Sequence, residues 1–154
     1  VSKGVYSIGK KKIDERKMLS DYTSNGKGMV VGYALFNKIG LTLYQDERIV
    51  IYTNVIATKQ KSIGNLLLKR VDLIFTDEII DLVSLLEILD IGFGIRGGDY
   101  LTYRNVVELL AKTYTDDNFK QVIGAIRYKY STIIKLHELL TRLNIKNACL
   151  DFFG

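Results

Sequence analysis

The chain has 154 residues, of which 47% are hydrophobic and 25% charged, and its formal net charge is +5. This composition is that of a globular protein and excludes a disordered or fibrous one. No apolar run reaches the roughly 18 residues of a membrane span, so we expect an intracellular protein that does not cross a membrane. The length predicts a single domain over residues 1–154. The single cysteine, Cys149, excludes an internal disulfide and a cysteine-based zinc site.

The first part of the chain, residues 1–27, is predicted to be a basic, partly ordered arm. Its residues from Ser7 to Lys27 are rich in Lys, Ser, Asp, Asn and Gly and show no sustained apolar period. One short helix is expected near Ile13 to Ser20.

Residues 29–75 form the β-rich part of the prediction. Three runs are rich in β-branched and aromatic residues, and polar turn segments separate them. The runs are Met29 to Phe36, Leu41 to Tyr44 and Ile49 to Ile56. This pattern predicts a three-stranded antiparallel meander. The segment after it, Ile63 to Phe75, fits either a helix through Leu68 or a strand through Phe75.

Residues 76–154 form the helical part. Thr76 is an expected N-cap with acidic residues in the turn that follows, and Gly92 is expected to end this first helix. A second helix, capped by Asp99, is predicted to run to about Tyr114. After residues 115–118, one long final helix is expected to end near residue 144. Because strands cluster first and helices follow, the predicted fold class is α+β, with a three-helix C-terminal unit.

Charge is divided along the chain into three blocks. Residues 1–75 carry 13 Lys and Arg against 6 Asp and Glu, residues 76–117 carry 3 against 9, and residues 118–154 carry 6 against 2. Two explanations remain open. Either the acidic middle packs against the basic flanks, or the basic surfaces face an external polyanion.

The segment from Gly92 to Gly98 contains a GxGxxG pattern at Gly92, Gly94 and Gly97. Over about eleven residues it resembles motif I of the S-adenosylmethionine-dependent methyltransferases, which implies a glycine loop that approaches a ligand. A site of that type needs a strand before the glycines, whereas the preceding pattern here is helical. The sequence therefore favours a loop that uses glycine for sharp turns, and ligand binding by it is left open.

The predicted final helix has one basic side and one apolar side. At 100° per residue, five of its cations fall within an arc of roughly 100°, and Tyr128 lies at the edge of that arc. They are Lys120, Arg127, Lys135, Arg142 and Lys146. Such a stripe suits a phosphate backbone, with a flanking aromatic ring to stack on a base. The basic arm has the same composition and supplies a second patch.

These features predict a non-enzymatic nucleic-acid-binding or accessory subunit, with DNA or RNA as its partner and with no cofactor and no metal. The candidate contact residues are Lys10, Lys11, Lys12, Arg16, Lys17, Lys120, Arg127, Tyr128, Lys135 and Arg142.

Two alternatives remain from the sequence. In the first, the protein is a homo-oligomer or a protein-interaction subunit that uses the apolar meander and the acidic segment 76–117 to bind a basic partner. In the second, it is a small nuclease, in which Tyr130, Lys135 and the lone histidine, His137, form an acid-base set resembling that of a metal-independent ribonuclease.

Overall fold

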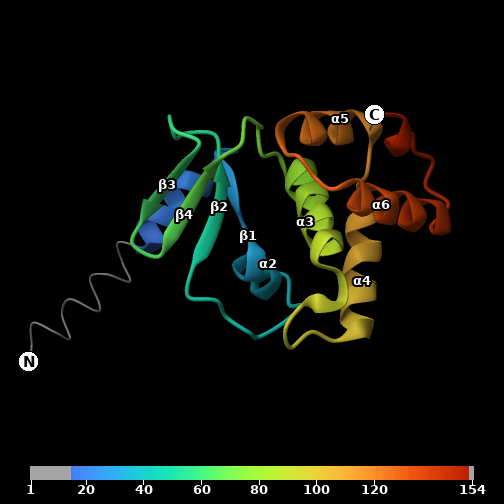
Figure 1. Cartoon of the computed structure of the whole chain (residues 1–154), viewed down its shortest axis with the longest axis horizontal. Helices are drawn as coiled ribbons and strands as arrows, with labels where there is room; N and C mark the ends of the chain where they lie inside the picture. Colours follow the sequence, from blue (N-terminus) through green and yellow to red (C-terminus); the bar gives the residue numbers. More distant parts are fainter. Residues whose placement is uncertain (1–14, 153–154) are drawn as a thin grey trace, which may run out of the picture.

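The computed structural model describes residues 15–152, and it places a sheet at one end of the molecule and a group of helices at the other (Figure 1). The chain begins with a helix over residues 15–23. The elements that follow are β1 (Gly28–Val31), α2 (Gly32–Lys38), β2 (Ile49–Thr53), β3 (Gln60–Ile63), β4 (Leu66–Arg70), α3 (Asp77–Ile91), η1 (Gly92–Gly94), α4 (Tyr100–Ala111), α5 (Asp116–Ala125), α6 (Tyr130–Arg142) and η2 (Cys149–Phe152). Among the described residues no helix combines the length and the apolar character that crossing a membrane requires.

The fold class is α+β, as predicted, but the sheet is not a three-stranded meander. It has four strands in the order β1-β2-β4-β3, with β2 and β4 parallel and the other two pairs antiparallel. The strand β4 lies within the segment that the sequence left open between helix and strand, and β3 ends at its first residue, Ile63. The neighbours of β2 are therefore β1 and residues 66–70, and not residues 41–44.

The first predicted strand is wrong beyond Val31. Gly32 has a φ of 66°, a left-handed conformation that glycine adopts easily, and the chain turns there into α2. The predicted second strand, residues 41–44, is a loop. Asn37 explains how the loop is held, because its side-chain Nδ2 donates hydrogen bonds to the carbonyl oxygens of Thr42 and Tyr44. The backbone carbonyls of this loop are thus hydrogen-bonded by a side chain and not by a neighbouring strand.

The helix over residues 15–23, expected near Ile13 to Ser20, covers one face of the sheet. Met18, Leu19 and Tyr22 of this helix pack against a buried cluster of three strand residues and one residue from the loop after β2. That cluster consists of Ile51, Ile56, Leu66 and Leu68. Residues 15–23 therefore belong to the packed fold, and residues 24–27 form the turn that leads to β1. Residues 1–14 of the predicted arm lie outside the described residues.

The other face of the sheet packs toward α3, which is the central helix of the structure (Figure 1). Its predicted ends are confirmed: the Thr76 hydroxyl accepts a hydrogen bond from the Ile79 backbone N–H at 3.2 Å, and Gly92 ends the helix with a φ of 64°. The helix is apolar nearly all round, and α4, α5 and α6 surround it. Its fully buried side chains include Leu82, Leu85, Leu86 and Ile88. Each such leucine or isoleucine contributes about 1.5–3 kcal/mol by leaving water.

The long final helix of the prediction is wrong, because two helices, α5 and α6, take its place. Asp99 and Thr115 cap α4 and α5 through their side chains. Helix α5 then ends at Ala125, and Ile126 and Lys129 on either side of the break have extended backbone conformations. Gly124 weakens the last turn of α5, and the break turns Tyr128 into the core, where it is 6% exposed. The described residues after the sheet thus form four helices, not three.

Candidate functional site

A cavity of about 510 Å³ lies between the end of α3, η1, α4 and α6. We call it the α4–α6 groove. Two of the predicted contact residues, Lys135 and Arg142, line it together. They stand seven residues apart on α6, so their side chains leave the same face two turns apart. The remaining lining residues are Leu89, Ile91, Gly92, Tyr103, Val107, Glu138 and Leu139.

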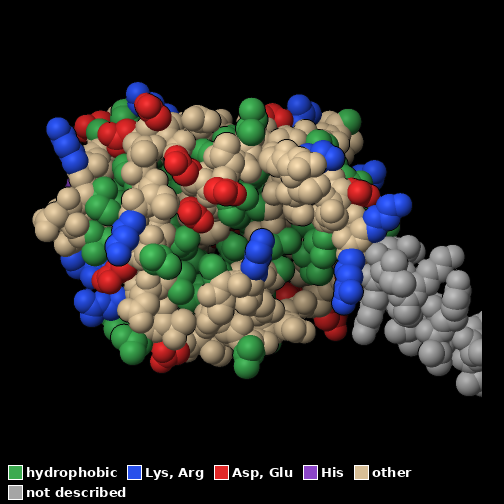
Figure 2. Space-filling model, turned by 180° about the vertical axis from the view of Figure 1, so that it is seen from behind, with side chains coloured by type: hydrophobic (Ala, Val, Ile, Leu, Met, Phe, Trp, Pro, Cys, Tyr) green, Lys and Arg blue, Asp and Glu red, His purple; other side chains and the backbone are tan. Residues whose placement is uncertain are grey.

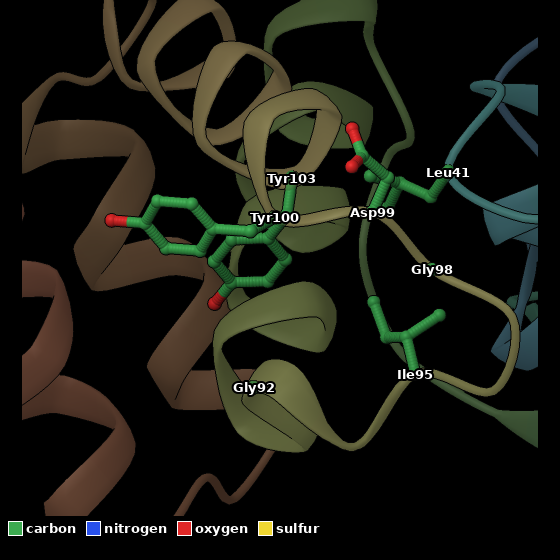
Figure 3. A pocket seen from close by; sticks show the side chains of 7 residues that line it. All are labelled: Leu41, Gly92, Ile95, Gly98, Asp99, Tyr100 and Tyr103. Atoms are coloured by element: carbon green, nitrogen blue, oxygen red, sulfur yellow. The ribbon is translucent and has the colours of Figure 1, made fainter.

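A second cavity of about 220 Å³ adjoins the groove, and Gly92 and Tyr103 line both. We call it the glycine-loop cavity. Figure 3 shows the rings of Tyr100 and Tyr103 on one side of this cavity, with Leu41 and Asp99 on the other. Tyr100 is 60% exposed. The lining of the groove and the cavity together thus includes two cations, Lys135 and Arg142, and two tyrosine rings.

The glycine-rich loop over residues 92–98, which lines part of the glycine-loop cavity, is anchored to the segment after α2. The Thr42 hydroxyl donates a hydrogen bond to the Arg96 carbonyl oxygen at 2.5 Å, and Arg96 Nη1 donates to the Tyr44 hydroxyl at 2.9 Å. Gly97 has a φ of 71°, and a Cβ there would lie 3.0 Å from the Thr42 hydroxyl oxygen. Glycine is therefore needed for a turn and for a close approach, as the sequence favoured.

The resemblance of this loop to a methyltransferase motif is not accompanied by the matching backbone. The glycines follow helix α3, and no strand enters them. Among residues 15–152, no three His, Cys, Asp or Glu side chains come together in a way that could hold a metal ion.

Lys135 and Arg142 are both held in place at the groove. Lys135 Nζ donates a hydrogen bond to the Leu89 carbonyl oxygen at 3.3 Å, at the end of α3 where free carbonyls favour a cation. Arg142 Nη1 lies 2.9 Å from Glu108 Oε1, which Arg104 Nε also approaches, to 3.2 Å. Hydrogen bonds from the two arginines lower the pKa of Glu108. Two arginines share one acid here, so the cluster keeps an excess positive charge.

The other predicted contact residues are not brought to the groove. Arg16 and Lys17 are exposed on the helix over residues 15–23, and Lys10, Lys11 and Lys12 lie outside the described residues. The ammonium group of Lys120 lies over the Phe152 ring, 4.5 Å from its centroid, and Arg127 is exposed in the link between α5 and α6. The predicted basic stripe assumed that residues 119–144 form one helix. Because the chain breaks at residues 126–129, the cations before and after the break do not lie on one helix face.

Sequence reasoning missed a polar cluster around Glu87, in the middle of α3. The Tyr52 hydroxyl, from β2, donates to Glu87 Oε1 and Oε2 at 3.2 and 3.3 Å. The buried Tyr128 hydroxyl lies close to the same carboxylate but outside hydrogen-bond geometry. Burial raises the pKa of Glu87 and, with the Glu87 charge, those of Tyr52 and Tyr128. The available signal was Glu87 itself, the single acid among residues 82–89, which are otherwise almost all apolar.

The suggested acid-base set of Tyr130, Lys135 and His137 is spread over different surroundings. His137 Nδ1 lies 3.2 Å from Asn147 Oδ1, and the ring is half-buried. Lys135 lines the α4–α6 groove, whereas His137 and Tyr130 are not among its lining residues.

Comparison with known proteins gives no match to this chain among family models, curated proteins or solved structures. The candidate site therefore stands on its geometry.

Proposed function

We propose that the protein is a non-enzymatic nucleic-acid-binding subunit that holds a single strand in the α4–α6 groove. The observation that carries the proposal is that Lys135 and Arg142 line one groove whose wall continues through Tyr103 into a second cavity with Tyr100. Phosphates would contact the two cations, and an unpaired base would stack on a tyrosine ring. Because a stacked base inside a duplex cannot enter such a cavity, the proposed ligand is single-stranded.

The ring that stacks in this proposal is not the one that the sequence suggested. Tyr128 is 6% exposed and belongs to the core, so it cannot reach a base without local unfolding. Tyr100 is at the first position of α4 with an exposed ring, and Tyr103 lies on the next turn. The aromatic contribution therefore comes from α4, and the cationic one from α6.

The experiment is fluorescence anisotropy of labelled oligo(dT) and oligo(U) of twelve nucleotides, with a matched duplex of the same length. We expect binding of the single strands at low salt that weakens steeply as salt rises, and weaker binding of the duplex. Lys135→Gln should weaken binding several-fold. The matched control is Lys61→Gln, which removes the same charge from an exposed position on β3. Lys61 does not line the groove. Equal losses in the two variants, or no binding at low salt, would contradict the proposal.

A further inference from the structure

The two edge strands of the sheet, β3 and β1, differ in side-chain exposure and in charge. At one edge, β3 exposes Gln60, Lys61 and Ser62, and such polar side chains with a lysine protect an edge from pairing with another chain. At the other edge, β1 has the sequence GMVV, without a charge or a proline. The sequence of β1 thus lacks these protections; Gly28, Met29 and Val31 are buried, and Val30 is the residue of the strand that is partly exposed.

The register shows which backbone groups of β1 point outward. The Asn54 N–H donates to the Lys27 carbonyl oxygen at 2.9 Å, so these two residues form a hydrogen-bonded pair of the antiparallel ladder. Such pairs alternate, so Met29 bonds to β2 and Val30 directs its N–H and C=O to the other side. Within residues 15–152, no backbone hydrogen bond satisfies these outward groups of Val30.

A groove runs beside this edge. A cavity of about 120 Å³ is lined by residues of β1 together with residues of the first helix, α2 and α3. Its lining residues are Thr23, Gly28, Met29, Val30, Leu35, Lys38 and Ile80. Figure 2 shows hydrophobic side chains gathered in a hollow over β1, α2 and α3, with acidic side chains grouped above it over the first turns of α3. An added strand would therefore find apolar contacts beside it.

Two acidic side chains of α3 lie near this groove. Asp77 and Asp81 stand one turn apart on the side of α3 that carries Ile80, and neither makes an ion pair within the described part of the chain. Glu78, on the far side of the helix, instead accepts a hydrogen bond from Asn118 Nδ2 at 3.0 Å. Burial and the charges of Asp77 and Glu78 raise the pKa of Asp81. Two carboxylates at a groove favour a cationic occupant.

We infer that the outer edge of β1 binds an extended, basic segment of a protein partner, which adds as a fifth strand. The partner backbone would bond to the outward N–H and C=O of Val30, and its Lys or Arg side chains would reach Asp77 and Asp81. Because Lys38 lies at the α2 end of the groove, the cations of the segment should lie toward α3. This surface is separate from the α4–α6 groove, so it is independent of the proposed nucleic-acid binding.

The test uses two capped hexapeptides, acetyl-(Lys-Val)3-amide and acetyl-(Glu-Val)3-amide, added to the full chain and followed by amide NMR. We expect the lysine peptide to shift the amide signals of Gly28 to Val31 and to slow hydrogen exchange at Val30. The glutamate peptide should do neither. Asp77→Asn with Asp81→Asn should weaken binding of the lysine peptide about two- to tenfold at low salt, as expected for exposed ion pairs.

A second variant tests the edge itself. Val30→Pro removes the outward N–H and no ladder hydrogen bond, so the variant should fold and lose the peptide. Gln60→Pro at the opposite edge is the control and should keep it, because the Arg70 N–H donates to the Lys59 carbonyl oxygen and the N–H of Gln60, the next residue, therefore points away from β4. The inference is overturned if the two peptides bind alike, if neither shifts the β1 amides, or if the Asp variants bind unchanged. It is also overturned if sedimentation shows that the edge of β1 pairs with a second copy of the chain.

Discussion

The Tyr52 hydroxyl donates to the Glu87 carboxylate across the boundary between β2 and α3, at 3.2 Å from Oε1. This contact joins the sheet to the central helix through one partly buried acid. Because burial raises the pKa of Glu87 above its ordinary 4.5, the folded protein binds this proton more tightly than the unfolded chain does. The stability that Glu87 contributes is therefore complete below about pH 4.5 and is lost as the pH rises through the folded pKa.

Glu87→Gln should remove this pH dependence. We expect the wild type to lose stability relative to the variant as the pH rises above about 4.5, because only the wild type must ionise a partly buried group. Urea denaturation of both proteins at a series of pH values from 4.5 upward measures the difference. Glu47→Gln, at an exposed loop position, is the control. If the free energy difference between wild type and Glu87→Gln stays constant with pH, the burial argument is wrong.

Gly28→Ala should destabilise the protein severely. A Cβ at this position would lie 2.3 Å from the Tyr52 carbonyl oxygen and 2.4 Å from that of Tyr22, and both are backbone atoms that cannot move aside without shifting β2 or the first helix. We expect a loss of more than about 3 kcal/mol, comparable to overpacking a core. Thermal denaturation gives the measurement. The matched control is Gly124→Ala, because a Cβ there meets no atom within 4 Å and the site is helical, so it should stabilise by about 0.5–1 kcal/mol. Similar effects of the two substitutions would refute the packing account.

The features that local sequence could predict are those that short-range chemistry decides. Thr76 and Asp99 cap helices because a short hydroxyl or carboxylate reaches the N–H three residues on, and Gly92 ends α3 because it adopts a positive φ. These interactions need no knowledge of the rest of the fold. The helix boundaries that rest on them were accordingly predicted well.

The features that could not be predicted depend on contacts between distant segments. Residues 33–36 belong to a sequence run that is rich in β-branched and aromatic residues, which favours a strand. They nevertheless form a helix, because Leu35 and Phe36 pack in the core. The parallel pairing of β2 with β4 has no local signal. The break between α5 and α6 follows from the burial of Tyr128, which a helical projection of the isolated segment places at the edge of a solvent face. The grouping of Lys135 with Arg142 was found, since both lie on α6, but their aromatic neighbours on α4 were not.

Removing both cations of the groove should change the salt dependence of nucleic-acid binding as well as its strength. For a single strand, each neutralised phosphate contributes about 0.7 to the slope of log affinity against log salt. Lys135→Gln with Arg142→Gln should therefore lower that slope by about 1.4. Anisotropy titrations at four salt concentrations measure it. A variant that loses affinity with an unchanged slope would show that the two cations act on the fold and not on phosphates.

Tyr100→Ala should weaken binding with little change in the salt slope. Stacking of a base on an aromatic ring contributes about 1–3 kcal/mol and involves no counterion. Tyr100 is 60% exposed, so its ring can be removed with a small cost in stability, and Tyr100→Phe should retain most of the affinity. The same titrations separate the two contributions. Equal losses for the Ala and Phe variants would place the effect in the hydroxyl group and contradict stacking.

Glu138→Gln should act in the opposite direction. Glu138 lines the α4–α6 groove between Lys135 and Arg142 on α6, and its carboxylate would repel a phosphate bound there. For exposed charges such repulsion amounts to at most about 1 kcal/mol, so the variant should bind a single strand up to about fivefold more tightly at low salt. The gain should disappear at high salt because screening removes the repulsion. Glu47→Gln changes the net charge equally from a loop before β2 and should leave affinity nearly unchanged. A gain of the same size in both variants would mean that only the overall charge of the protein matters, whereas a gain confined to Glu138→Gln locates the phosphates in the groove.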